Sequence, residues 1–217
     1  PYMDNYNYHK GMNGIIQELT GLLKTQHIGT DSDRALLLDF QATLETKPEK
    51  AIKLEKDALA QIETITADNA RLVSNLHANL GGLYRMNGHP DLAREHMEKS
   101  ISLLDQFNLL HINDSIPQIA NYAMFLTEQQ EPERGISELQ KLSGIIKEYH
   151  SDDCLDYAKV QETLGTIYLM TANLPQAKTH FKRAFKIYEK IWADEPEMIE
   201  AKYQEIQELY PQIGFCI

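Results

Sequence analysis

The chain has 217 residues, 42% of them hydrophobic and 24% charged, a composition typical of a soluble, well-packed protein. Its formal net charge of -11 argues against binding of nucleic acid or of an anionic membrane, because both need a basic surface. Its apolar runs fall well short of the roughly 20 residues that span a bilayer. The two cysteines, Cys154 and Cys216, lie far apart and outside any metal-binding spacing. We therefore expect a cytoplasmic protein without a cofactor, a metal ion or a disulfide framework.

The first predicted element is an amphipathic helix at residues 8–24. Its apolar residues recur at helical spacing and therefore share one face: Ile15, Ile16, Leu19, Leu22 and Leu23. This helix precedes a repeating pattern and matches it only after a shift of one residue, so we expect a leading half-unit within residues 1–31. The chain begins with Pro1 rather than methionine, and we expect it to be a piece of a longer protein.

From residue 32 onward the sequence repeats with a period of 42 residues. Pro48, Pro90 and Pro132 stand 42 residues apart, and an acidic residue follows each of them. A small residue recurs with the same 42-residue period in four copies of the repeat: Ala51, Ala93, Gly135 and Ala177. Proline is tolerated at the first position of a helix, and an acidic residue there favours the positive end of the helix dipole. Each proline therefore predicts the start of a helix.

Apolar positions ahead of each proline recur with the same period, which predicts a second helix in every repeat. They are Leu38, Leu80, Tyr122 and Leu164, followed four residues later by Ala42, Tyr84, Leu126 and Tyr168. Between them stand Asp39, Gly81, Ala123 and Gly165, small in three copies of four. Small residues let two helices approach closely, so we expect antiparallel pairs such as 69–87 with 90–106. The first copy departs from this pattern at Asp39 and at Glu55, which stands where Met97, Leu139 and Phe181 are apolar.

The end of the chain continues the pattern for half a repeat. Ile206 and Tyr210 stand 42 residues after Leu164 and Tyr168, and Pro211 ends the helix. Glutamates make this helix polar on its free side, as a terminal unit of a stack requires. We expect four repeats and a terminal capping helix, at residues 32–73, 74–115, 116–157, 158–199 and 200–217.

Two segments resemble the tetratricopeptide repeat: residues 78–88 with Ala93, and residues 164–168 with Ala177, Phe181 and Ala184. The 42-residue period is similar to the lengthened repeats of kinesin light chains and of many bacterial repeat proteins. The resemblance extends over nearly the whole chain. It implies an all-α fold, a right-handed α-α superhelix of about four helix hairpins with an extra helix at each end, which forms a single domain at residues 1–217.

In this family the first helix of each hairpin lines a concave groove that binds peptides. Carried over to matching positions, the resemblance nominates Asn79 and Asn121, whose amides could hold the backbone of an extended peptide. The further groove candidates are Asn75, Gly82, Met86, Met124, Glu128, Lys159, Glu162, Thr166 and Met170. Methionines at such positions would give adaptable apolar contact. The Lys, Arg and Asn residues with which some members clamp a carboxylate tail are absent from the matching positions, apart from Lys159.

Other polar residues give no catalytic or metal-binding pattern. His89 and His96 are seven residues apart, about 10 Å along a helix, and cannot share one metal ion. Asp152 and Asp153 precede an amphipathic segment and are interpreted as its N-terminal cap. Trp192 is expected to pack under the last helix rather than to stack on a ligand. We therefore predict no enzymatic activity.

The resulting hypothesis is an interaction scaffold that binds a protein or peptide partner in its groove, without contact to nucleic acid or membrane. The alternative is a peptide-sensing regulatory domain of a larger bacterial protein, similar to quorum-peptide sensors. An upstream DNA-binding or catalytic domain would favour the sensor, whereas further repeats would favour the scaffold. The sequence leaves the identity of the partner and the oligomeric state open.

Overall fold

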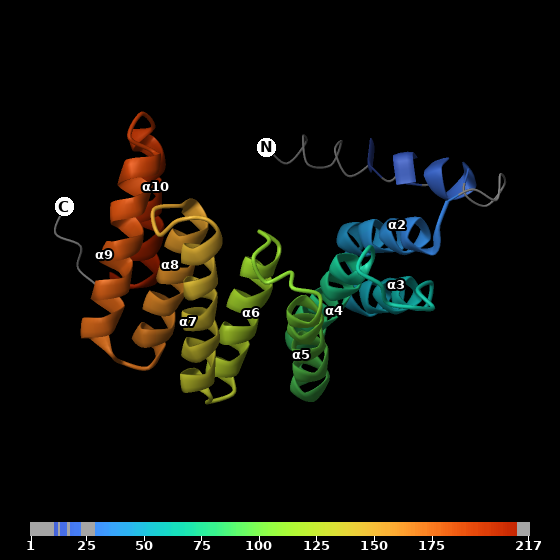
Figure 1. The fold of residues 1–217 in the computed structure, drawn as a ribbon, viewed down its shortest axis with the longest axis horizontal. Coiled ribbons are helices and arrows are strands. Elements are labelled where there is room, and N and C mark those ends of the chain that lie inside the picture. The colour runs from blue at the N-terminus through green and yellow to red at the C-terminus, as the bar shows by residue number, and fades with distance from the viewer. Residues whose placement is uncertain (1–10, 13, 17, 23–28, 212–217) are drawn as a thin grey trace. The chain divides into compact units, whose positions relative to one another are not determined.

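The computed structural model describes residues 11–12, 14–16, 18–22 and 29–211, in which the regular structure is entirely helical (Figure 1). Compact packing divides the chain into two units, Pro1–Leu109 and Leu110–Ile217. Within the predicted leading helix, residues 11–12, 14–16 and 18–22 are helical, whereas 8–10, 13, 17 and 23–24 lie outside the described residues. The all-α fold of helix hairpins is thus confirmed, while the single domain spanning both units stays a prediction.

The first unit contains two helix hairpins. Helix α2 (Asp31–Leu44) pairs with α3 (Pro48–Leu59), α4 (Ala70–Met86) pairs with α5 (Pro90–Gln106), and α3 packs on α4. Both predicted proline starts are confirmed, because Pro48 and Pro90 are the first residues of their helices. The bounds of α4 and α5 agree with the expected 69–87 and 90–106 to within one residue.

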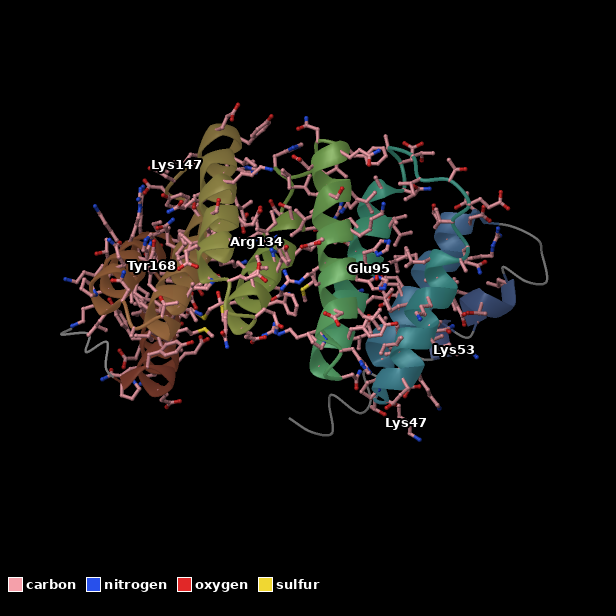
Figure 2. The ribbon with its side chains drawn as sticks, turned by 90° about the horizontal axis from the view of Figure 1, so that it is seen from below. Lys47, Lys53, Glu95, Arg134, Lys147 and Tyr168 are labelled. Carbon is pink, nitrogen blue, oxygen red and sulfur yellow. The ribbon has the colours of Figure 1, made fainter. Side chains whose placement is uncertain are left out.

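The second unit continues the same arrangement. It contains α6 (Ser115–Glu128), α7 (Pro132–Tyr149), α8 (Leu155–Met170), α9 (Leu174–Ile191) and α10 (Pro196–Leu209). The pairs α6–α7 and α8–α9 are hairpins, α8 also packs on α6 and α7, and α10 packs on α9. The second helices of the hairpins carry exposed charges, such as Lys53 on α3, Glu95 on α5 and Lys147 on α7 (Figure 2).

The turn within three of the hairpins uses one residue with left-handed backbone geometry. These residues stand 42 apart: Gly88 (φ 72°), Gln130 (φ 64°) and Ala172 (φ 59°). At the first of them, Gly88 N–H donates to the carbonyl of Arg85 and His89 N–H to that of Tyr84, the bonding pattern of a Schellman cap. The same two bonds recur 42 and 84 residues later. In these three hairpins the turns therefore repeat with the same period as the helices.

Small residues set the distance between the paired helices. A Cβ added to Gly81 would lie 2.5 Å from Cγ of Met97, and one added to Gly165 would lie 2.9 Å from the ring of Phe181. In the third hairpin the glycine is on the other helix, and a Cβ on Gly135 would lie 2.6 Å from the carbonyl oxygen of Ala123. Each of these crossings therefore requires one glycine.

Candidate functional site

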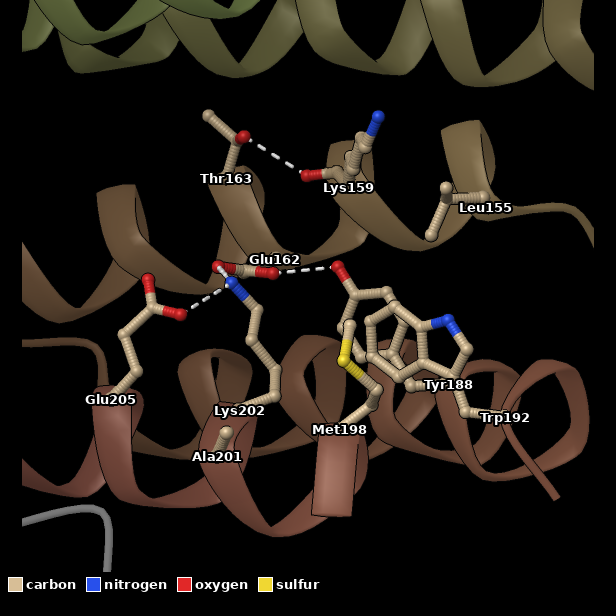
Figure 3. Close-up of a pocket in the computed structure, with 10 residues that line it drawn as sticks. All are labelled: Leu155, Lys159, Glu162, Thr163, Tyr188, Trp192, Met198, Ala201, Lys202 and Glu205. Carbon is tan, nitrogen blue, oxygen red and sulfur yellow. Dashed lines mark hydrogen bonds and ion pairs between the residues drawn. The ribbon is translucent and has the colours of Figure 1, made fainter. Parts of the chain in front are cut away.

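A hollow of about 480 Å³ lies within the second unit, between α8, the end of α9 and α10 (Figure 3). It is lined by Leu155, Lys159, Glu162, Thr163, Tyr188, Trp192, Met198, Ala201, Lys202 and Glu205. Two of the predicted groove residues, Lys159 and Glu162, are thus brought together with residues of two other helices.

The hollow exists because α10 rests on α9 rather than directly on α8. The ring of Tyr203 on α10 stacks on Phe185 of α9, with centroids 4.1 Å apart and planes within 5°. This contact leaves a space between α8 and α10. The half-buried Trp192 gives that space an aromatic surface and stacks on the buried Tyr188, with centroids 4.8 Å apart. An aromatic surface of this kind contacts an apolar side chain over a large area.

A charged bridge crosses the hollow. Glu162 on α8 accepts a hydrogen bond from the hydroxyl of Tyr188 at 2.6 Å and lies 2.9 Å from the ammonium of Lys202 on α10. The same ammonium lies 3.0 Å from a carboxylate oxygen of Glu205. Burial lowers the pKa of Lys202, but its hydrogen bonds to Glu162 and Glu205 outweigh burial and raise the pKa above its ordinary value. Burial and the neighbouring Glu162 raise the pKa of Tyr188. The bridge is therefore charged and satisfied at neutral pH.

The mouth of the hollow combines one cation with apolar surface. The Lys159 side chain is 55% exposed and its ammonium lies 3.8 Å from Asp156, a distance at which the pair is weak. Met198 is 44% exposed. Because the polar groups of the bridge already pair with one another, the hollow suits an apolar side chain, with a carboxylate beside it at Lys159. Among the described residues, no group of three or more His, Cys, Asp or Glu side chains could hold a metal ion.

The family model of tetratricopeptide repeats matches residues 115–190, which include α6 to α8 and most of α9. Over these residues the chain is similar to tetratricopeptide repeats. The resemblance predicted from the sequence is thus confirmed. A comparison with curated proteins finds no match. In the described part of the chain, no helix is long and apolar enough to cross a membrane.

Solved structures share the tetratricopeptide fold over most of this chain. BtubC (BKLC) from P. vanneervenii has a TM-score of 0.70 at 19% identity, covering 84% of this chain and 72% of its own. A Podosopora anserina protein of nearly identical TPR-like repeats, named as a kinesin light chain, has a TM-score of 0.66 at 15% identity, with coverages of 87% and 92%. MamA has a TM-score of 0.57 at 15% identity, with coverages of 86% and 94%. At these identities the likeness establishes the fold.

The other predicted groove residues of the second unit lie on first helices, as expected. Thr166 and Met170 continue along α8 beyond the hollow, and Met170 is 47% exposed. On α6, Asn121 and Glu128 are exposed and Met124 is half-buried. Their contact with a peptide stays a prediction.

In the first unit the predicted groove residue Asn79 binds two carboxyl groups of its own chain. Its Nδ2 donates to Asp39 at 2.9 Å and to Glu55 at 3.1 Å. Both N–H bonds of the amide are therefore used, and its carbonyl oxygen is the atom left to meet a peptide. Of the remaining candidates on α4, Asn75 and Gly82 are half-buried, whereas Met86 is 81% exposed.

The carboxyl pair that Asn79 joins is itself unusual. Glu55 is 2% exposed, and its Oε2 has no hydrogen-bond partner among the described residues. Burial, together with the charge of Asp39, raises the pKa of Glu55 to about 8, and burial also raises the pKa of Asp39. The pair therefore retains a proton near neutral pH.

Sequence reasoning missed a histidine cluster in the second hairpin. His77 Nδ1 and His96 Nδ1 are 2.9 Å apart, so one ring donates to the other, and His96 stacks on Tyr84. Burial, followed by the charges of His96 and Lys99, lowers the pKa of His77 to about 4, and burial lowers that of His96. The sequence signal that could have found it is the repeat of His96 two periods later, at His180. In the fourth hairpin His180 lies 2.9 Å from the side-chain oxygen of Gln161 and stacks on Tyr168.

The predicted cap at Asp152 and Asp153 is wrong. The N-cap of α8 is Cys154, whose Sγ accepts from the N–H of Tyr157 at 3.5 Å. Asp152 instead lies 3.7 Å from both Lys147 and Arg183, and Asp153 pairs with Lys190. Both aspartates precede the cap position, and basic side chains of α7 and α9 attract them. Trp192, predicted to pack under the last helix, is half-buried and lines the hollow opposite α10.

Proposed function

We propose that this chain is a non-enzymatic scaffold that binds a segment of a partner protein, and that the hollow between α8, α9 and α10 is an anchoring pocket for that segment. The tetratricopeptide fold supports a role in protein interaction in general. The observation that carries the finer proposal is the half-buried Trp192, stacked on the buried Tyr188, beside the open mouth with Lys159.

Binding would use the two parts of the hollow differently. An apolar side chain of the partner would displace water from Trp192 and Met198, which supplies most of the affinity. A carboxylate next to that side chain would meet the ammonium of Lys159, which adds orientation and speed of association rather than much affinity. The bridge of Glu162 and Lys202 holds α8 and α10 apart at a fixed distance and keeps the pocket formed before binding.

The test is selection of peptides from a displayed random library against the full chain, followed by affinity measurement from the fluorescence of Trp192, its sole tryptophan. We expect selected peptides to carry an apolar residue next to an acidic one. Met198→Glu should lower the affinity of these peptides at least tenfold, because it places a negative charge at the pocket mouth. Met170→Glu is the matched control, since Met170 is similarly exposed and lies on α8 outside the hollow.

The outcomes separate the hollow from the rest of the predicted groove. Loss of binding with Met198→Glu and not with Met170→Glu supports the pocket. Loss with Met170→Glu alone would move binding to the remaining part of α8. Peptides that bind with no change in either variant, or no selected peptide at all, would overturn the proposal.

A further inference from the structure

Helix α9 concentrates positive charge in an acidic protein. It carries one acidic residue, Glu189, and five basic residues: Lys178, Lys182, Arg183, Lys186 and Lys190. The whole chain has 32 acidic and 21 basic residues, so nearly a quarter of its basic side chains lie on this helix of 18 residues. This distribution distinguishes α9 from the acidic surface that the net charge describes.

The basic side chains form a line on the face of α9 that points away from the core. Lys182, Lys186 and Lys190 follow one another at intervals of four residues, about 6 Å apart along the helix, and all three are exposed. The opposite face is buried through Ala177, Phe181, Ala184, Phe185, Ile187 and Tyr188. We call Lys182, Lys186 and Lys190, with the adjacent Arg183, the basic stripe.

The chain neutralises only part of this stripe. Lys190 pairs with Asp153, and Arg183 lies 3.7 Å from Asp152 while its guanidinium stacks over the ring of Tyr157. Within the described ranges, Lys182 and Lys186 form no ion pair, although the charge of Lys186 helps to lower the pKa of Asp153. Two adjacent ammonium groups are therefore available to an external anion.

The surroundings of the stripe restrict the size of that anion. Asp152 lies beside Arg183 and Asp153 beside Lys190, and the neighbouring α10 carries Glu197, Glu200, Glu205 and Glu208 against a single Lys202. Packed helices are about 8 to 10 Å apart, which is close to the Debye length at physiological salt. A long nucleic acid or a membrane surface would be repelled by these acidic residues. A short acidic segment would not, because it can contact the stripe alone.

We propose that the basic stripe of α9 is a second interaction surface, which docks a short acidic helix of a partner protein. Glutamates or aspartates four residues apart on one face of that helix repeat at the same spacing of about 6 Å as the lysines. The stripe shares no residue with the hollow, so this docking is independent of the pocket proposed above.

The experiment uses the full chain and a fluorescently labelled, alanine-based helical peptide with glutamates at every fourth position. Its affinity is measured by anisotropy at 20 and 150 mM salt. We expect binding that weakens with salt, and at least a tenfold loss with the double variant Lys182→Glu and Lys186→Glu. The matched control is Lys47→Glu with Lys53→Glu, two exposed lysines of the first unit that change the net charge equally (Figure 2).

Further arms identify the class of anion. A peptide with glutamine in place of glutamate should bind at least tenfold more weakly. A DNA duplex and vesicles containing phosphatidylserine should bind more weakly than the acidic helix. The proposal is overturned if the acidic helix shows no binding at 20 mM salt, if the control variant loses as much affinity, or if duplex or vesicles bind more tightly through the same lysines. Circular dichroism confirms that both variants remain folded.

Discussion

The first hairpin, α2 with α3, solves the crossing of its helices differently from the three hairpins that follow. In those three, a glycine lets the backbones approach: Gly81 under Met97, Gly135 against Ala123, and Gly165 under Phe181. The matching positions of the first hairpin hold Asp39 and Ala51, and Glu55 stands where Met97 and Phe181 stand. A packed apolar contact is thus replaced by two carboxyl groups joined by the amide of Asn79.

The turn of the first hairpin differs as well. The C-cap of α2, Glu45, is extended (φ -78°, ψ 133°), whereas the matching Asn87 has ψ 9°. Thr46 likewise lacks the positive φ of Gly88, the residue that matches it one repeat later. A 42-residue period can therefore be kept in the sequence while the interactions that hold one repeat together change. Because the first hairpin depends on carboxyl groups, we expect its stability to depend on pH in a way that apolar crossings do not.

The largest expected effect is the pH dependence of the carboxyl pair. Folded Glu55 keeps its proton up to about pH 8, whereas its ordinary pKa is 4.5. Between these values the folded state binds more protons, so the free energy of unfolding falls as the pH rises. At about 1.4 kcal/mol per pH unit, the expected loss is on the order of 5 kcal/mol across this range. Glu55→Gln should remove most of it.

The measurement is urea unfolding followed by circular dichroism, with the fluorescence of Trp192 reporting the second unit separately. His77 and His96 have lowered pKa values, so they destabilise the fold only as the pH falls below about 6.5. Titration from pH 6.5 to 8.5 therefore isolates the carboxyl pair. Equal unfolding midpoints at pH 6.5 and 8.5, or the same pH dependence in Glu55→Gln, would show that Glu55 is not protonated in the folded state.

The next effect tests the close approach of the other hairpins. Gly135→Ala places a Cβ 2.6 Å from the carbonyl oxygen of Ala123, a backbone atom that cannot rotate away. We expect a loss of about 1 to 3 kcal/mol from overpacking. Gly144→Ala on the same helix is the control, because nothing lies within 4 Å of its added Cβ. It should gain up to about 1 kcal/mol from helix propensity.

Unfolding of both variants is followed through Trp192, which lies in the same unit. The difference between the two substitutions is the decisive quantity, since each adds one methyl group to α7. If Gly135→Ala were as stable as Gly144→Ala, glycine at this crossing would not be required. The first hairpin, with Asp39 and Ala51 at the matching positions, would then not differ from the others in this respect.

The sequence predicted what depends on a regular period and missed what depends on distant partners. Helix starts at Pro48, Pro90 and Pro132 follow from local chemistry and are confirmed. The departure at Asp39 and Glu55 was visible, but its resolution required Asn79, 40 residues from Asp39. Spacing alone could not show that α10 rests on α9 and leaves a hollow beside Lys159 and Glu162.

The smallest effect concerns the turns. Ala172 has φ 59°, a left-handed conformation that costs a residue with a Cβ about 1 kcal/mol and costs glycine little. Gly88 already occupies the matching position in the second hairpin, so Ala172→Gly should stabilise the second unit by up to about 1 kcal/mol. Ala193→Gly is the control: it lies in the turn between α9 and α10 without a positive φ, and it should be neutral or destabilising because glycine has more freedom when unfolded. Both are measured by urea unfolding through Trp192. Stabilisation by Ala172→Gly would show that the left-handed conformation of this turn strains Ala172. A loss of stability would mean that the methyl group of Ala172 makes a contact that outweighs the strain.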